Sequence, residues 1–400
     1  MTQIHCLDTP TPMVPEDSSD RIEQLDSVRG LAALSVVFCH HLLLIKPISE
    51  TYHNEYPGLG YALLLLPPAL IFWAGHAAVI LFFVLSGYVL TLPMLRGRQP
   101  VYWYYLVKRI CRIYLPYAAA VAGAMLLASA LSARKIPELS ESFGRSWTVP
   151  LTRQHIVEHA ILIRGFDMMA FNGVIWSLVH EMRISIVFPL FALFIVRMRW
   201  WWCLAGAICL SLFGLYGVRL YWRLSFLQEY RLTFHYTALF VLGGILAKYR
   251  LRLTAFMKAL SPNIRFGLVA LGCVLYTAEG FHPAARGNGW LLHPFEYLIA
   301  IGASIFIVYA VNASWLRAKV LVWLGRVSYS LYLWHSPVML ATIHIGYAYL
   351  PLWVLFVSSI GLGILVSGVM HRIVEVPATQ LAKWIGVATR SRFRKTVAAG

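Results

Sequence analysis

Long apolar stretches alternate with short polar or basic segments along most of this chain. A helix of about 20 apolar residues crosses the hydrocarbon core of a bilayer, which is about 30 Å thick. The apolar segment 59–73 contains Pro67 and Pro68, which favour an interfacial or re-entrant piece, with an eleventh crossing as the alternative. The pattern predicts an all-α polytopic membrane protein with about ten transmembrane helices, at residues 28–46, 75–92, 113–132, 174–196, 200–217, 235–247, 265–280, 291–311, 327–344 and 351–372.

The distribution of Lys and Arg predicts which side of the membrane each loop occupies. With ten crossings, the segments on the side of the N-terminus carry more than twice as many basic residues as the opposite loops. Cytoplasmic segments hold this excess in membrane proteins, so we predict that both termini are cytoplasmic. Residues 1–27 would then be a cytoplasmic segment, 28–373 the membrane domain and 374–400 a basic cytoplasmic tail. The outer loop 133–173 is the longest connection, and such loops are often functional.

Composition supports the membrane class and narrows the partners. The chain is 59% hydrophobic and 13% charged, with a mean hydropathy of +0.67, whereas soluble domains are about 25% charged. The formal net charge is +17, but the basic residues lie beside apolar spans, which favours a lipid bilayer over nucleic acid as partner. The 6 cysteines are scattered without a CxxC pair and are expected to be small core residues.

The stretch "RGLAALSVVFCHH" places ionisable residues inside the first predicted span. Arg29 and His40 are 11 residues apart, which is three helical turns plus about 20°, so both lie on one face. Their separation along the axis is about 16 Å, which places Arg29 at the cytoplasmic mouth and His40 near the midplane. In the simpler explanation, Arg29 is a positive-inside anchor and His40 is a hydrogen-bonded histidine of the core. His41 is turned about 100° away and receives no role.

Two further spans bring ionisable residues to mid-depth, which favours a functional site. In 174–196 these are His180, Glu181 and Arg183, although an internal Arg–Glu pair could serve packing alone. The "HE" pair is not a zinc-protease motif, because Ile184 replaces the second histidine, and we predict no metal site.

The second of these spans, 327–344, contributes His335 at a similar depth. Pro337 leaves the carbonyl of Leu333 without its helical donor. A local opening there would suit a binding cavity.

The segment "KRICRIYLPY" supplies Lys108, Arg109 and Arg112 at the cytoplasmic end of the third span. Arg109 and Arg112 are three residues apart on a helix, and paired guanidinium groups suit phosphate recognition. A positive-inside stop signal is the alternative for this motif. In "FFVLSGYVL", Ser86 and Gly87 permit close approach of another helix.

Taken together, these motifs resemble the membrane-bound acyltransferase-3 family, whose members O-acylate bacterial glycans. The resemblance covers almost the whole chain and includes the late "VEVP" segment. It implies an acyl-CoA donor, most often acetyl-CoA, reached from the cytoplasm, and a hydroxyl acceptor on a carbohydrate or lipid-linked saccharide. It also implies a multi-pass protein of the bacterial inner membrane with no permanently bound cofactor. The esterase-like domain of some relatives is not found in this sequence.

The resemblance also implies roles for individual residues. The expected catalytic residues are His40, Glu181 and His335. The expected acyl-CoA phosphate ligands are Arg29, Lys108, Arg109 and Arg112. Trp176 and Trp290 are expected to contact the acceptor, although Trp290 could equally be an interfacial anchor.

Three mechanistic questions stay open from the sequence. His40 could act as a general base or form an acyl-histidine. Glu181 could orient either His40 or His335, or stabilise an imidazolium. The intramembrane His, Glu and Arg residues are also compatible with a proton-coupled transporter or an export partner. Against the transporter, the chain shows no internal repeat with matched broken helices.

Overall fold

A computed structural model describes residues 22–53, 63–97, 101–131, 136–163, 167–218, 227–281 and 289–385, without the side chains at 142, 281 and 289–292. The described part of the chain is helical and contains no strand. The long helices are α1 (Glu23–Leu42), α5 (Gly75–Leu95), α6 (Tyr102–Leu131), α9 (Trp176–Arg197), α10 (Trp200–Leu212), α12 (Arg231–Ala259), α13 (Pro262–Tyr276), α15 (Gly289–Ala310), α16 (Lys319–Gly346) and α17 (Leu352–Met370).

Shorter helices connect or extend the long ones. They are α2 (Lys46–Tyr52), η2 (Leu63–Leu65), α4 (Pro67–Leu70), α7 (Glu141–Arg145), α8 (Arg153–Ala160), η3 (Gly173–Ile175), η4 (Phe213–Gly217), η6 (Ala278–Phe281), η7 (Ser314–Arg317) and η8 (His371–Glu375). The described part of the segment 59–73 holds only η2 and α4, and a four-residue helix spans about 6 Å, too little to cross a bilayer.

Each of the ten predicted spans overlaps one long helix, but only some of these helices are apolar throughout. Among the described residues, six spans are long and apolar enough to cross a membrane: Gly75–Leu95, Tyr102–Leu131, Gly173–Arg197, Trp200–Gly217, His293–Ala310 and Leu352–Ile385. The helices α1, α12 and α16 contain more polar and charged residues, and α13 is shorter. The protein is therefore a multi-pass all-α membrane protein, and ten crossings stay a prediction.

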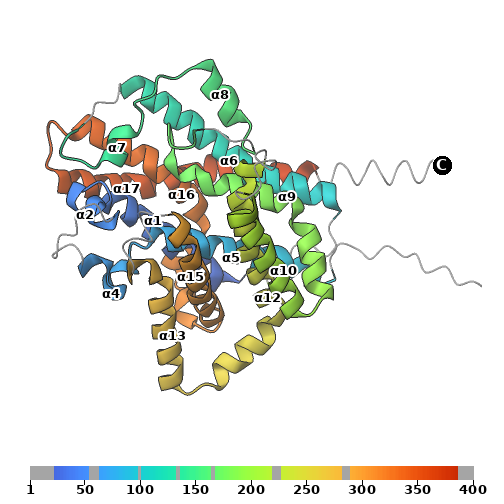
Figure 1. Cartoon of the computed structure of the whole chain (residues 1–400). Coiled ribbons are helices and arrows are strands. Elements are labelled where there is room, and N and C mark those ends of the chain that lie inside the picture. The colour runs from blue at the N-terminus through green and yellow to red at the C-terminus, as the bar shows by residue number, and fades with distance from the viewer. Residues whose placement is uncertain are drawn as a thin grey trace, which may run out of the picture.

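Helix α1 lies inside the bundle, packed against α16 and α5, while α5 also packs along α12 (Figure 1). Small residues allow these close approaches. A Cβ on Gly30 would lie 2.6 Å from the backbone nitrogen of Gly325 in α16. A Cβ on Gly87 would overlap the carbonyl oxygen of Phe240 in α12, which confirms the close approach predicted from "FFVLSGYVL".

The surface of the bundle exposes large apolar side chains on several helices. Leu190, Phe266 and Leu365 are exposed, as is Leu251 on the hairpin of α12 and α13 that projects from the bundle (Figure 1). In water this surface would be unfavourable, but in hydrocarbon it is not, because lipid tails are as apolar as leucine. The exposed surface is consistent with a lipid environment.

Candidate active site

Two of the predicted catalytic residues meet in the centre of the bundle. Nδ1 of His40, in the last turn of α1, lies 2.8 Å from Nε2 of His335, in the middle of α16. The two rings stack with their centroids 5.1 Å apart and their planes inclined by 17°. His335 is buried and His40 is half-buried. The prediction that these residues share one depth agrees with this contact.

The hydrogen bonds of His335 define which ring nitrogens carry protons. Nδ1 of His335 lies 2.9 Å from the carbonyl oxygen of Leu331, and a carbonyl oxygen can only accept, so Nδ1 carries the proton. In the neutral ring, Nε2 of His335 then accepts from Nδ1–H of His40. Nε2 of a neutral His40 is left with a lone pair, and no described residue bonds to it. A lone pair in this position is what a general base requires.

The long connection before α9 ends beside His335. Asn172 is fully buried, and its Nδ2 donates to the carbonyl of Leu333 at 3.0 Å. This is the carbonyl that Pro337 deprives of its helical donor, so the side chain fills the opening expected there. The residue before Leu333, Tyr332, donates its hydroxyl to the carbonyl of Val174 at 2.8 Å.

The predicted acidic residue, Glu181, pairs with Arg109. Nη2 of Arg109 in α6 donates to Oε1 of Glu181 at 2.9 Å, and to Oγ of Ser185 at 2.7 Å. The hydroxyl of Ser86 lies 3.4 Å from the same carboxylate oxygen. The hydrogen bonds of Glu181 thus reach neither His40 nor His335, the two histidines that the sequence left open as its partner.

The pair also corrects the predicted depths. The sequence placed Arg109 at the cytoplasmic end of the third span and Glu181 at mid-depth, yet their contact puts both at one level. The reason lies in the segment before α9. Phe171 and Val174 are buried there, so α9 begins inside the bundle rather than at its outer surface.

The remaining basic residues of the predicted donor site differ in exposure. Arg112 is exposed and Lys108 is half-buried on the same helix as buried Arg109. Nη1 of Arg29 lies 3.5 Å from Oδ1 of Asp26, one turn earlier on α1. Arg112 is the most accessible of these cations.

Of the two predicted acceptor residues, only the Trp176 side chain is described. It is half-buried at the start of α9, where its ring stacks on His76 at 6.4 Å and meets His180 edge-on at 6.1 Å. Trp290 belongs to α15, but its side chain lies outside the described residues.

Two residues that received no predicted role have structural contacts. Nδ1 of His41 bonds the carbonyl of Val37 at 2.8 Å, and its Nε2 bonds Oγ of Ser359 in α17, also at 2.8 Å. Arg183 donates to the carbonyls of Ile163 at 2.9 Å and Glu229 at 2.6 Å. Both side chains tie neighbouring segments to the bundle.

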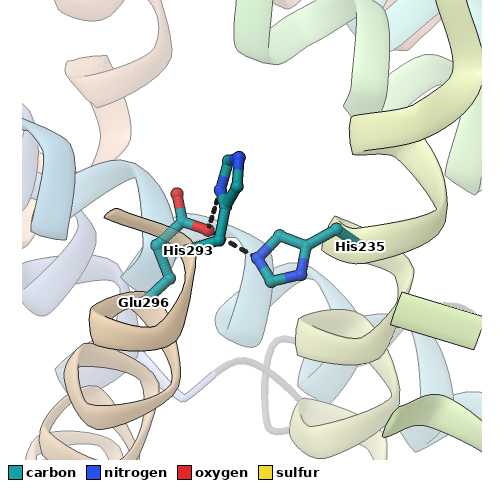
Figure 2. A group of neighbouring side chains, drawn as sticks. All are labelled: His235, His293 and Glu296. Atoms are coloured by element: carbon teal, nitrogen blue, oxygen red, sulfur yellow. Dashed lines mark hydrogen bonds and ion pairs between the residues drawn. The ribbon is translucent and has the colours of Figure 1, made fainter. Parts of the chain in front are cut away.

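A second polar cluster, which the sequence analysis missed, surrounds Glu296 of α15. His235 of α12 and His293 of α15 both point at one oxygen of this carboxylate (Figure 2). His76 of α5 lies 2.9 Å from the other oxygen. The sequence did contain a signal, because His293 and Glu296 are three residues apart and share a helix face in an apolar span.

Comparison with known proteins gives one match. A family model of the acyltransferase-3 type, described as an acyltransferase domain, matches residues 22–372. This range contains the His40–His335 pair, the Arg109–Glu181 pair and the Glu296 cluster, and the match confirms the resemblance found in the motifs. No curated protein and no solved structure matches the chain.

Proposed function

The chain belongs to the acyltransferase-3 family, and from that premise we propose that it transfers an acyl group from acyl-CoA to a carbohydrate hydroxyl, with His40 as general base. The observation that carries the proposal is the hydrogen bond from His40 to His335. This bond engages Nδ1 of His40 and leaves its Nε2 available to a hydroxyl. The favoured acyl group is acetyl, and the favoured location is the bacterial inner membrane.

In the proposed reaction, Nε2 of His40 removes the proton from the acceptor hydroxyl as its oxygen attacks the thioester carbonyl. The new C–O bond forms, the C–S bond breaks, and the CoA thiolate takes the proton back from His40. His335 acts as a positioning residue, because its Nε2 holds Nδ1–H of His40. His335 also stabilises the imidazolium that forms when His40 is protonated. The orienting carboxylate of a catalytic triad has the same role.

The donor would bind at the end of α6, where its phosphates meet positive charge. Arg112 is exposed there and Lys108 half-buried, so both suit phosphate contacts. Arg29 lies about 16 Å along α1 from His40, and the pantetheine arm would extend over this distance. Arg109 is buried against Glu181, so its proposed contribution to the donor site is to fix this end of α6.

The acceptor would reach His40 from the opposite end of the bundle. Trp176 at the start of α9 is half-buried, and an aromatic ring suits stacking against a sugar. Asn172 and Val174, at the end of the long loop and the start of the segment leading into α9, contact Leu333 and Tyr332, which precede His335 on α16 by two and three residues.

The test uses purified full-length protein, labelled acetyl-CoA and a panel of glycan acceptors. Replacement of the base, His40→Ala, should lower kcat by about 10²–10⁴-fold, the range expected for loss of a general base. His53→Gln is the matched control, because His53 is an exposed histidine after α2. Its activity should equal that of the wild type.

Two results would contradict the proposal. Wild-type rates in His40→Ala would remove His40 from the chemistry. An acyl-enzyme trapped on His40 by rapid quenching and mass spectrometry would replace general-base catalysis with covalent catalysis.

A further inference from the structure

The cluster around Glu296 plays no part in the proposed acyl transfer. Glu296 and His235 are fully buried, and His293 is nearly so. The residues come from three helices that are far apart in the sequence, α5, α12 and α15, and each residue lies within the first turns of its helix. In the predicted orientation, these helix starts face the outer side of the membrane.

Three ligand atoms converge within the cluster. Nε2 of His235, Nδ1 of His293 and one oxygen of Glu296 lie within 4.8 Å of one another. Figure 2 shows that the two imidazoles approach the carboxylate from different helices. Zinc binds nitrogen and carboxylate oxygen at about 2.0–2.2 Å, so neighbouring ligand atoms of a tetrahedral site lie about 3.3–3.6 Å apart. Small side-chain rotations would bring the three atoms to this spacing.

Neighbouring groups already orient the ligand atoms. Oγ of Ser211 lies 2.6 Å from Nδ1 of His235, and can accept its proton so that Nε2 keeps a lone pair. Nε2 of His76 donates to the second oxygen of Glu296 at 2.9 Å. Metal-binding histidines and carboxylates commonly have such hydrogen-bond partners, which fix the tautomer and the orientation.

The charge of the cluster also favours a cation. Among the described residues, the hydrogen-bond partners of Glu296 are three imidazoles and the hydroxyl of Tyr236, 3.4 Å away. No described Lys or Arg lies at hydrogen-bonding distance from this carboxylate. A buried carboxylate is costly unless positive charge compensates it. A divalent ion would supply that charge.

We propose that His235, His293 and Glu296 bind one divalent transition-metal ion of the zinc type. Two imidazoles and a carboxylate are ligands that suit zinc. Three protein ligands leave a fourth position, which a water molecule or a polar group of a ligand can take. Because binding is measured without the transfer reaction, this proposal and the proposed function can fail independently.

The test uses full-length protein purified through a tag without histidine, treated with EDTA and then equilibrated with ZnCl₂. Mass spectrometry of the metal content should give about one zinc ion per chain, as expected for a single site. His235→Gln and His293→Gln should abolish this binding. Ser211→Ala should weaken it about 10–100-fold, because it removes only an orienting contact. His53→Gln should bind as the wild type does.

Co²⁺ provides a measurement that needs no variant. Bound in the wild-type protein, it should give the visible absorption bands of a tetrahedral site, and added Zn²⁺ should remove them. Equal zinc content in the wild type and in a folded His235→Gln/His293→Gln double variant would overturn the proposal. So would a wild type without these Co²⁺ bands, which would make the cluster a hydrogen-bonded core only.

Discussion

At the scale of single residues, the histidine pair makes a prediction about position 335. Glutamine there can still accept a hydrogen bond from His40 through its side-chain oxygen, whereas alanine cannot. We expect His335→Ala to lower kcat about 100-fold, within the range of general-base contributions. His335→Gln should retain at least about ten times the kcat of His335→Ala on the same grounds. Steady-state kinetics with acetyl-CoA measure both variants.

The Michaelis constant for acetyl-CoA distinguishes a loss of His40 positioning from a general loss of folded structure in this experiment. It should stay unchanged in both variants, because His335 does not lie in the basic donor site. If the glutamine and alanine variants lose the same activity, His335 does not act through its hydrogen bond to His40.

Spacing alone was enough to predict much about the first helix. Arg29 and His40 both lie on the single helix α1, so their spacing of 11 residues puts them on one face. The partner of His40 was not predictable, because Glu181 and His335 both had suitable depths. The choice depends on how α1, α9 and α16 pack. The partner of His41 was not predictable either, because its bond to Ser359 depends on the position of α17.

At the scale of helices, Arg109 and Glu181 form a charged contact between α6 and α9. Glu181→Gln removes the counter-charge of a guanidinium whose side chain is only 9% exposed. We expect a loss of about 2–4 kcal/mol in stability, somewhat less than for a fully buried pair. Thermal unfolding in detergent measures this as a lower Tm. The double variant Arg109→Gln/Glu181→Gln should recover part of the loss, because neither charge is then left alone.

Arg112→Gln is the matched control for this pair. Arg112 is exposed on the same helix, so its loss should leave Tm unchanged and raise the Michaelis constant for acyl-CoA. Strictly additive effects of the two single variants at 109 and 181 would show that the pair contributes no coupling.

Helix positions followed from the apolar pattern, but the segments between helices did not. Pro337 indicated that the carbonyl of Leu333 needs a new donor, without indicating that Asn172 supplies it. Asn172 lies in a long loop, and no local pattern places it in the bundle. The Glu296 cluster was not predicted for a related reason. Its histidines are near helix ends and resemble isolated interfacial residues in the sequence. Only the packing of α5, α12 and α15 brings them together.

At the scale of the whole molecule, the number of crossings decides where the hairpin between α12 and α13 lies. If ten helices cross, the hairpin is cytoplasmic, in agreement with the basic residues Arg250, Arg252 and Lys258 nearby. If only the six most apolar helices cross, α12 and α13 do not, and the hairpin lies on the same side as the loop before α9.

Single cysteines in a cysteine-free background distinguish these two topologies. Asn263 in the hairpin and Thr148 in the long loop are both exposed. A membrane-impermeant maleimide applied to spheroplasts should label Thr148→Cys and leave Asn263→Cys unlabelled, whereas inverted vesicles should give the opposite result. Ser314→Cys, exposed between α15 and α16, lies on the side opposite to Thr148 in both topologies and serves as the control. Labelling of Thr148→Cys and Asn263→Cys from the same side would reject ten crossings, because it requires an even number of crossings between positions 148 and 263.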